Sequence, residues 1–423
     1  MQSAKADFVR FQRRVSNPSC SAGLMRILFA NDGIGDAGGV QTYLAAVMPA
    51  LAARGHAVAL LHLDPLRGGE GTPAPAGAPH FCIAGRGVGG ALGDARGWAP
   101  DVVFSHNLRP LEVERRMLDA WPVVKMMHGY FGTCIGGQKT HLFPRAEPCG
   151  RVFGAACLAL YVPRRNGRLS LPYIADQWRW ASEQNALFGR YAAVVTASGH
   201  MRREYLRNGV PEDRAHAIPL FSTLAPADQP APAPESFRIL FLGRMTRLKG
   251  GDLLIRAVAD ASKRLGRALP VTMSGDGPQR AEWEALARAL GVAADFPGWV
   301  DAEARLRLIR AASVLAVPSV WPEPFGLVGL EAASQGVPAV AFDVGGIGEW
   351  LVEGENGRLA PGDPPRPEAL ADLLAWAASD PGALNALRPG ALAAAQRMTV
   401  DAHVTRLEQV LASSASASPA GAR

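Results

Sequence analysis

The 423-residue sequence predicts an α/β protein with two domains, each built on a parallel β-sheet covered by helices. Two observations favour this fold class. Short apolar segments alternate with helical stretches in both halves of the chain, and this alternation is typical of βαβ units. Between the two series lies a segment rich in proline and alanine, 225–236, whose prolines favour an extended linker that serves as a hinge.

The first domain is expected at 25–224. Residues 1–24 contain Lys5 and three arginines but no apolar segment of signal-peptide length, so we expect a disordered extension rather than an export signal. The strands of this domain are predicted at 26–30, 57–63, 102–105, 123–127 and 193–197.

The second domain is expected at 237–400, with strands predicted at 237–242, 270–274, 313–317 and 337–342. The segment 401–412 is apolar at helical spacing and predicts a closing helix. The Ser/Ala-rich residues 413–423 predict a disordered tail.

Composition indicates a globular protein. Hydrophobic residues make up 48% of the chain and charged residues 19%. No apolar run approaches the roughly 20 residues of a membrane-spanning helix. We therefore expect a cytoplasmic protein.

Charge is distributed unevenly along the chain. Lys and Arg number 25 against 16 Asp and Glu through residue 225, and 19 against 22 afterwards. A basic first half favours peripheral contact with anionic lipid at the inner face of the membrane, or binding of an acidic acceptor. A solvated basic surface is the simpler alternative. Nucleic-acid binding is disfavoured because no basic-aromatic module is present.

Two carboxylates give the clearest functional signal. Glu323 and Glu331 lie eight positions apart, where a strand predicted at 313–317 leads into a helix predicted at 327–335. Ligands of open α/β sheets bind at the carboxyl ends of the strands, so both carboxylates are expected beside a ligand.

The start of this helix predicts a phosphate site. Its free N–H groups, near Phe325, Gly326 and Leu327, would form a seat for an anion. Glu331, one turn inside the helix, could accept two hydrogen bonds from the vicinal diol of a ribose.

The segment 318–359 resembles the nucleotide-binding half of retaining glycosyltransferases of family 4. It joins the two glutamates to Gly336-Val337-Pro338 and to the Gly345-Gly346 loop. The resemblance covers residues 25–410 and implies the GT-B fold, in which two Rossmann-like domains face each other across a cleft and the last helix crosses back onto the first domain. It also implies that Glu331 holds the nucleotide ribose and that Glu323 contacts the donor sugar.

The same resemblance implies a site for the diphosphate. Arg244 and Lys249 stand in a G-R-x5-K arrangement after the strand predicted at 237–242, and in the family such residues grip the diphosphate. Negative charge grows on this group when the sugar leaves, and fixed cations stabilise it. We therefore expect no catalytic metal and no cofactor, and the chain contains no Asp-x-Asp.

Other family positions fall on loops that follow predicted strands. Gly275 lies in a glycine turn beside the nucleotide, and the backbone of Trp299 and Val300 is expected to line the base pocket. In the first domain, His128 follows the strand predicted at 123–127 and matches a family histidine near the donor sugar. A lone histidine is more often structural, but its position after a strand favours a catalytic role.

A glycine-rich loop follows the first strand. Gly33-x-Gly35-x-x-Gly38 matches the dinucleotide fingerprint formally, so an NAD-dependent dehydrogenase is one alternative. Asn31 and Asp32, which separate the strand from the first glycine, disfavour it. The preferred interpretation is the family's amino-terminal loop, in which Gly38 and Gly39 face the donor phosphate and the acceptor.

Three cysteines and one histidine cluster in the first domain. Cys134, His141, Cys149 and Cys157 are separated by seven, eight and eight positions. This is a legitimate ligand set for structural zinc, but it lacks the close C-x2-C pair. Free thiols in a reducing compartment are favoured, and the segment is expected to shape the acceptor side.

These patterns together predict a metal-independent hexosyltransferase. It would move a sugar from a nucleotide diphosphate to a hydroxyl of a glycan, a lipid-linked or a small-molecule acceptor, with retention of configuration. The family implies that the leaving phosphate takes the acceptor proton. A non-catalytic sugar-nucleotide binding subunit stays open, although Arg244, Lys249 and Glu323 are all intact.

Overall fold

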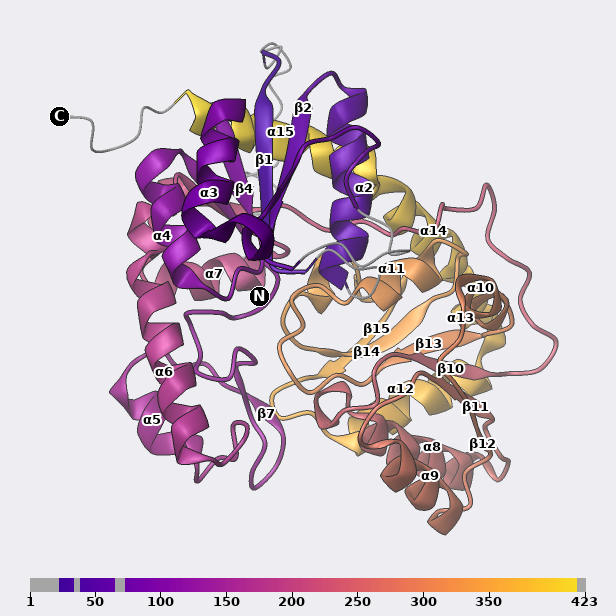
Figure 1. Ribbon diagram of the computed structural model, residues 1–423. Helices are drawn as coiled ribbons and strands as arrows, with labels where there is room; N and C mark the ends of the chain where they lie inside the picture. Colours follow the sequence, from indigo (N-terminus) through magenta and orange to yellow (C-terminus); the bar gives the residue numbers. More distant parts are fainter. Residues whose placement is uncertain (1–22, 34–38, 65–72, 417–423) are drawn as a thin grey trace.

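The computed structural model describes residues 23–33, 39–64 and 73–416. Figure 1 shows two α/β units, one indigo to magenta and the other orange to yellow, with the last helix lying on the first unit. The expected extension falls outside the described residues, except for its last two positions. The prediction of two Rossmann-like parallel sheets is confirmed.

Within the described residues, the first sheet has seven parallel strands in the order β3-β2-β1-β4-β5-β8-β9. Its central strands are mostly apolar because both faces of a parallel sheet are covered. In β1, Ile27 and Phe29 enter one core, while Leu28 and Ala30 enter the other. The strands are β1 (Arg26–Asn31), β2 (Ala57–His62), β3 (His80–Cys82), β4 (Val102–Ser105), β5 (Val123–Met127), β8 (Ala193–Thr196) and β9 (Ala215–Ala217).

The helices of the first domain alternate with these strands. They are α2 (Gly39–Ala53), α3 (Ile83–Trp98), α4 (Leu111–Ala120), α6 (Leu171–Ala186) and α7 (Gly199–Arg207). An insertion between β5 and α6 adds the small antiparallel pair β6 (Thr140–His141) and β7 (Glu147–Pro148), followed by α5 (Ala155–Tyr161).

The second sheet, as far as the chain is described, has six parallel strands in the order β12-β11-β10-β13-β14-β15. They are β10 (Ile239–Leu242), β11 (Val271–Ser274), β12 (Ala294–Gly298), β13 (Val314–Val317), β14 (Ala339–Asp343) and β15 (Gly357–Pro361). The helices are α8 (Gly251–Leu265), α9 (Arg280–Ala289), α10 (Ala302–Arg310), α11 (Leu327–Ala333), α12 (Pro367–Ser379), α13 (Pro381–Ala386) and α14 (Arg388–Arg397).

The closing helix belongs to the core of the first domain. This helix, α15 (Val400–Ala415), packs against α2 and is three residues longer than expected at its end. Its residues Val404, Leu407 and Leu411 are fully buried in the same cluster as Ile27 and Phe29 of β1. The return of the chain to the first domain is therefore part of the hydrophobic core.

The proline-rich segment is held by the second domain. Ala227 N–H donates to Ser334 O at 2.8 Å, and Ala231 N–H donates to Gln335 O at 2.9 Å. Arg388 adds a bond from Nε to Ala231 O at 3.1 Å. These bonds attach residues 227–231 to the second domain, and the hinge expected in this segment stays a prediction.

No helix in the described part of the chain is both long and apolar enough to cross a membrane.

Candidate active site

The carboxyl ends of the two sheets face each other. After β8, Gly199 N–H donates to Glu349 Oε1 of the second domain at 2.7 Å. The ring of Tyr130, after β5, lies 6.5 Å from the ring of Trp321, after β13. The loops in which both domains carry predicted site residues therefore meet at this interface.

Lys249 and Glu323 form an ion pair at the carboxyl end of the second sheet. Lys249 Nζ lies 2.6 Å from Glu323 Oε1, and Ser319 Oγ donates to the same oxygen at 2.6 Å. Only 5% of the Glu323 side chain is exposed, against 27% for Lys249. Lys249, which is expected to bind the diphosphate, and Glu323, which is expected to bind the sugar, are thus paired with each other in the free protein.

Arg244 lies in the loop after β10 and is exposed. None of the ion pairs between described residues involves its side chain. Its loop is fixed by Met245 N–H, which donates to Asp276 O at 2.8 Å, and by Gly243 N–H, which donates to Ser274 O at 3.0 Å. The backbone is therefore held while the guanidinium stays available to a ligand.

Gly275 explains how two loops come this close. Its φ is +133°, and a Cβ at this position would lie 2.0 Å from Gly243 O. A side chain would therefore push the Arg244 loop away from the 274–277 turn. Gly275 N–H also donates to Gly298 O at 2.8 Å. The glycine thus places the Arg244 loop, whether or not it touches a ligand itself.

Gly298 leads into the predicted base-binding residues. Trp299 has 78% of its surface exposed and Val300 is half-buried. Their backbone follows directly on Gly298, so it lies beside the Gly275 turn. The placement is compatible with the predicted base pocket, in which the backbone rather than the indole ring is the contact.

Glu331 is paired with an arginine that the sequence did not reveal. Arg305 Nη1 of α10 lies 3.2 Å from Glu331 Oε1. Burial raises the pKa of Glu331, and the charge of Arg305 opposes that shift. A ribose that binds Glu331 would therefore meet a carboxylate already oriented by Arg305.

The start of α11 presents backbone rather than side chains. Phe325 is 1% exposed, and its carbonyl accepts a bond from Trp350 Nε1 at 2.8 Å. Gly326 precedes the helix and Leu327 is its first residue. The first N–H groups of a helix have no partner inside it, so these positions can offer only their N–H groups to a phosphate.

The Gly345-Gly346 loop packs against the backbone of Glu323. Gly346 N–H donates to Glu323 O at 2.6 Å. Gly345 has a φ of +60°, and a Cβ there would lie 2.4 Å from Glu323 N. The glycine pair therefore lets one loop lie directly on the backbone of the other, which fixes the position of the carboxylate.

His128 follows β5, as predicted, and contacts a second histidine. Its Nε2 lies 2.9 Å from Nδ1 of His106, which is fully buried after β4. Burial, together with the nearby charge of Lys125, lowers the pKa of His128 to about 3, so the ring is neutral at pH 7.

His106 determines which nitrogen of His128 carries hydrogen. Nε2 of His106 is buried with no partner among the described residues. A hydrogen there would be an orphaned donor, which proteins avoid more strongly than an orphaned acceptor. We therefore assign the hydrogen of His106 to Nδ1, which donates to His128 Nε2. His128 is then left with Nδ1–H as its own donor.

Tyr43 packs against His128 and is hydrogen-bonded to His403. The Tyr43 ring packs edge-on to His128 at 5.5 Å, and its hydroxyl bonds His403 Nε2 at 2.7 Å. His403 Nδ1 bonds Pro219 O at 2.8 Å. The helix α15 thus holds the ring that packs against His128.

Asp32 is a further group that the sequence analysis did not select. It follows β1, and both of its carboxylate oxygens accept from Arg109 N–H at 2.9 Å. Burial raises its pKa to about 6, although the bond from Arg109 opposes the shift. The glycine loop beside it is only partly visible: Gly39 begins α2, while Gly35 and Gly38 lie outside the described residues.

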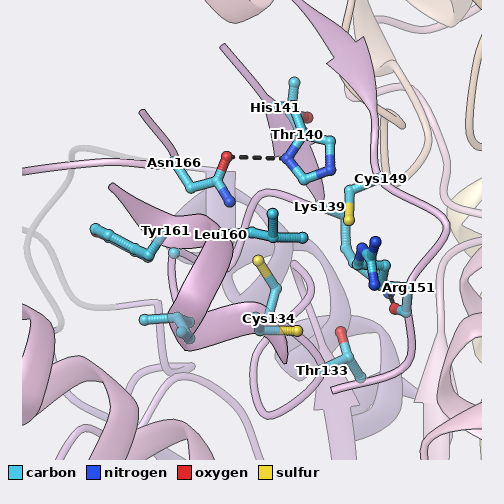
Figure 2. A pocket seen from close by; sticks show the side chains of 13 residues that line it. Thr133, Cys134, Lys139, Thr140, His141, Cys149, Arg151, Leu160, Tyr161 and Asn166 are labelled. Atoms are coloured by element: carbon cyan, nitrogen blue, oxygen red, sulfur yellow. Dashed lines mark hydrogen bonds between the residues drawn. The ribbon is translucent and has the colours of Figure 1, made fainter. Parts of the chain in front are cut away.

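The cysteine cluster lines a pocket but does not form a ligand set. Figure 2 shows Cys134, His141 and Cys149 around this pocket, which Cys157 also lines. His141 Nδ1 contacts the side-chain amide of Asn166 at 3.1 Å. Among the described residues no group of three or more His, Cys, Asp or Glu is placed to hold a metal ion. The four cysteines in the described segments are free thiols.

Two family models match the chain. The model described as Glycosyltransferase Family 4 matches residues 37–221, and the model described as Glycosyl transferases group 1 matches residues 227–392. The boundary between the two matches falls at the proline-rich segment.

Curated relatives extend the similarity. A glycogen synthase of Mycobacterium tuberculosis is 30% identical over 318 residues, which are 73% of this chain and 67% of the relative. A D-inositol 3-phosphate glycosyltransferase of Xylanimonas cellulosilytica is 28% identical over 92% of this chain and 94% of its own length. A protein with the same name from Kribbella flavida is 39% identical, but over only 41% of this chain and 44% of its own.

Solved structures share the fold. Sucrose-phosphate synthase from Thermosynechococcus elongatus superposes with a TM-score of 0.64 at 21% identity, over 91% of this chain and 98% of its own. Anabaena HepE in complex with UDP-glucose gives 0.64 at 20% identity, over 92% of this chain and 100% of its own.

Proposed function

Since the chain belongs to glycosyltransferase family 4, we propose that it moves a hexose-type sugar from a nucleotide diphosphate to an acceptor hydroxyl with retention of configuration. The observation that supports this most is the Lys249–Glu323 ion pair beside the exposed Arg244. The pair and Arg244 follow the neighbouring strands β10 and β13 of the second sheet, while His128 follows β5 of the first sheet. HepE, whose structure has been solved with UDP-glucose, makes a uridine donor the first to test.

The ion pair suggests how donor binding proceeds. The diphosphate would draw Lys249 from Glu323, and Arg244 would bind it from the exposed side. Glu323, released from Lys249, would accept hydrogen bonds from the sugar hydroxyls. Glu331 would hold the ribose, and the N–H groups at the start of α11 would contact phosphate oxygens. Lys249 would thus exchange a carboxylate for the diphosphate, and Glu323 would exchange Lys249 for sugar hydroxyls.

Transfer then needs charge stabilisation and one proton movement. As the bond from the sugar to the phosphate breaks, negative charge grows on the phosphate and is stabilised by Arg244 and Lys249. The acceptor hydroxyl attacks on the same face and gives its proton to the leaving phosphate oxygen. His128 Nδ1–H would donate to a hydroxyl of the sugar and orient it. The acceptor class we propose is a glycan or a lipid-linked saccharide.

Two alternative functions are a dehydrogenase and a non-catalytic sugar-nucleotide binding subunit. The dehydrogenase alternative is not supported, because the family match covers both domains. A non-catalytic subunit would bind the nucleotide sugar without consuming it. Measurements of turnover, and not of nucleotide-sugar binding, therefore distinguish the transferase from such a subunit.

Thermal shift with UDP, GDP, ADP and their sugars tests the proposal. A ligand that binds only the native state stabilises it by about 2.7 kcal/mol at a concentration 100 times its Kd. We expect one base to raise the Tm clearly above the others. The matching nucleotide sugar should then release nucleotide when an acceptor is added. Stabilisation without release would indicate the binding subunit, and the absence of any stabilisation would refute the donor site.

The glutamate variants should separate ribose binding from sugar binding. Glu331→Ala is expected to weaken free nucleotide and nucleotide sugar alike by about 1.5–3 kcal/mol, because a charge-assisted bond to ribose is lost. Glu323→Ala should preserve or raise the affinity for free nucleotide, since Lys249 loses its competing partner, and should reduce turnover. Calorimetric titration measures both affinities.

Glu303→Ala is the matched control for this pair. Glu303 lies on α10 two residues before Arg305, but its side chain is 83% exposed and, within the described part of the chain, forms an ion pair with Arg307 alone. It should change neither binding nor turnover. Equal loss of free-nucleotide affinity in the Glu323 and Glu331 variants would disprove the assignment.

Brief treatment with excess chelator should leave transfer intact. Arg244, Lys249 and the start of α11 already supply positive potential to the diphosphate, so no divalent ion is required. Initial rates before and after EDTA measure this. Loss of activity that only added Mg²⁺ or Mn²⁺ restores would contradict the model.

A further inference from the structure

Exposed apolar side chains concentrate in the insertion of the first domain. Among the described residues, nine large hydrophobic side chains are exposed. Six of them lie between residues 143 and 171, within a chain of 423. They are Phe143, Val152, Leu158, Val162, Leu169 and Leu171.

The helix α5 accounts for the centre of this surface. It contains no charged residue. On its inner side Tyr161 is 1% exposed and packs with Ile135 and with Ile174 of α6. Leu158 and Val162, one turn apart, are 42% and 48% exposed on its outer side. The helix therefore buries one apolar face and leaves a second one uncovered.

Positive charge predominates around this apolar face, although Glu147 of the insertion pairs with Arg164 at 3.4 Å. Residues 148–175 contain four arginines and no aspartate or glutamate. Arg165 lies over the ring of Phe143 at 5.0 Å, and Arg168 lies over the ring of Tyr173 at 5.8 Å. Phe143 N–H donates to Arg164 O at 3.1 Å, which brings the β6–β7 loop beside the end of α5. Apolar and cationic side chains thus share one surface.

We propose that this surface docks the protein on an anionic lipid bilayer. We call it the docking surface and define it by Phe143, Leu158, Val162, Arg165, Arg168 and Leu169. Aliphatic and aromatic side chains would enter the interfacial region of the bilayer, while the guanidinium groups bind anionic headgroups. Figure 1 shows α5 and α6 side by side at the outer end of the first domain, away from α8 and α9.

The composition of the surface favours a bilayer over a soluble polyanion. An acidic polysaccharide would use the arginines but would gain nothing from exposed Leu158, Val162 and Leu169. The sequence predicted membrane contact from the basic charge of the whole first half, and the structure narrows the candidate surface to one insertion. Docking does not depend on the proposed transferase activity, because it is measured without donor.

Vesicle sedimentation with the full chain tests the proposal. We expect binding to phosphatidylcholine vesicles that contain phosphatidylglycerol and little binding to phosphatidylcholine alone. Arg165→Gln/Arg168→Gln should weaken binding about fivefold per arginine, the equivalent of about 1 kcal/mol each. Leu158→Ser/Val162→Ser should weaken it independently, also at high salt, where screening reduces the contribution of the arginines.

Arg288→Gln/Leu290→Ser is the matched control. It removes one exposed arginine and one exposed leucine at the end of α9 in the second domain, and should bind vesicles like the wild type. All variants should keep the wild-type Tm and its shift with nucleotide, so a failure of docking is distinguishable from a failure of the donor site.

Three results would overturn the proposal. One is equal binding to both kinds of vesicle. Another is wild-type binding by the Arg165/Arg168 variant. The third is full binding by the Leu158/Val162 variant together with displacement by heparin, which would indicate a site for acidic polymers instead.

Discussion

His128→Ala is expected to lower kcat by about 10²–10³-fold, the usual cost of removing one preorganised donor, while nucleotide affinity stays unchanged. The histidine belongs to the first domain, whereas Arg244, Lys249 and Glu331 all belong to the second. Nucleotide binding therefore does not need it, but an assembled active centre does. Steady-state kinetics and nucleotide titration on the same variant measure the two quantities separately.

Two further variants show whether His128 acts directly. His106→Phe removes the donor to His128 Nε2 but keeps a ring, so it should reduce kcat less than His128→Ala does. His216→Gln is the control. His216 lies in the edge strand β9, which β8 separates from the strand that precedes His128, and its replacement should have no effect. If His128→Ala transferred sugar at the normal rate, the residue would be a core histidine and no part of the site.

Arg244→Ala is expected to lower both nucleotide affinity and turnover. Loss of a charge-assisted phosphate contact should weaken binding by about 1.5–3 kcal/mol. Loss of charge stabilisation on the leaving group should reduce kcat by about 10²–10³-fold. Since no ion pair of the described residues involves the exposed Arg244, the Tm without ligand should not change. Kinetics with the nucleotide sugar and a melting curve measure these effects.

Lys249→Ala should behave differently in one respect. Among the described residues it leaves the buried carboxylate of Glu323 with the Ser319 hydroxyl as its one side-chain partner, so the Tm should also fall. Arg247→Ala, two residues before Lys249 and exposed, is the control and should change nothing. An Arg244 variant with wild-type nucleotide affinity would remove this residue from the diphosphate site.

The central strands could be predicted because both of their faces are buried. Strands such as β10 and β13 read as continuous apolar runs. The strands that were missed lie toward the sheet edges and lack this pattern. β3 and β9 are three residues long, and in β12 Asp295 and Pro297 point to solvent. Edge strands need neither length nor apolar runs, so local sequence does not reveal them.

The positions of the candidate residues in the fold could be predicted, while their roles stay predictions. Glu323, Arg244 and Lys249 follow strands of the second domain, and Glu331 lies within α11. Their partners could not be predicted, because the contacts join distant parts of the chain. Tyr43 and His403 are 360 positions apart, and Lys249 and Glu323 are 74 apart. One signal was available for His106, which follows a strand just as His128 does.

The burial of α15 in the first domain has a consequence for biosynthesis. The strands of the first sheet are translated by residue 217, but Val404, Leu407 and Leu411, which complete one side of its core, are translated only after the second domain. Translation of the intervening second domain takes roughly 10–40 s at the usual rates of elongation. During that time Ile27 and Phe29 face an incomplete core. The first domain is therefore expected to expose an apolar surface until α15 has been made, although its strands are the first part of the fold to be translated.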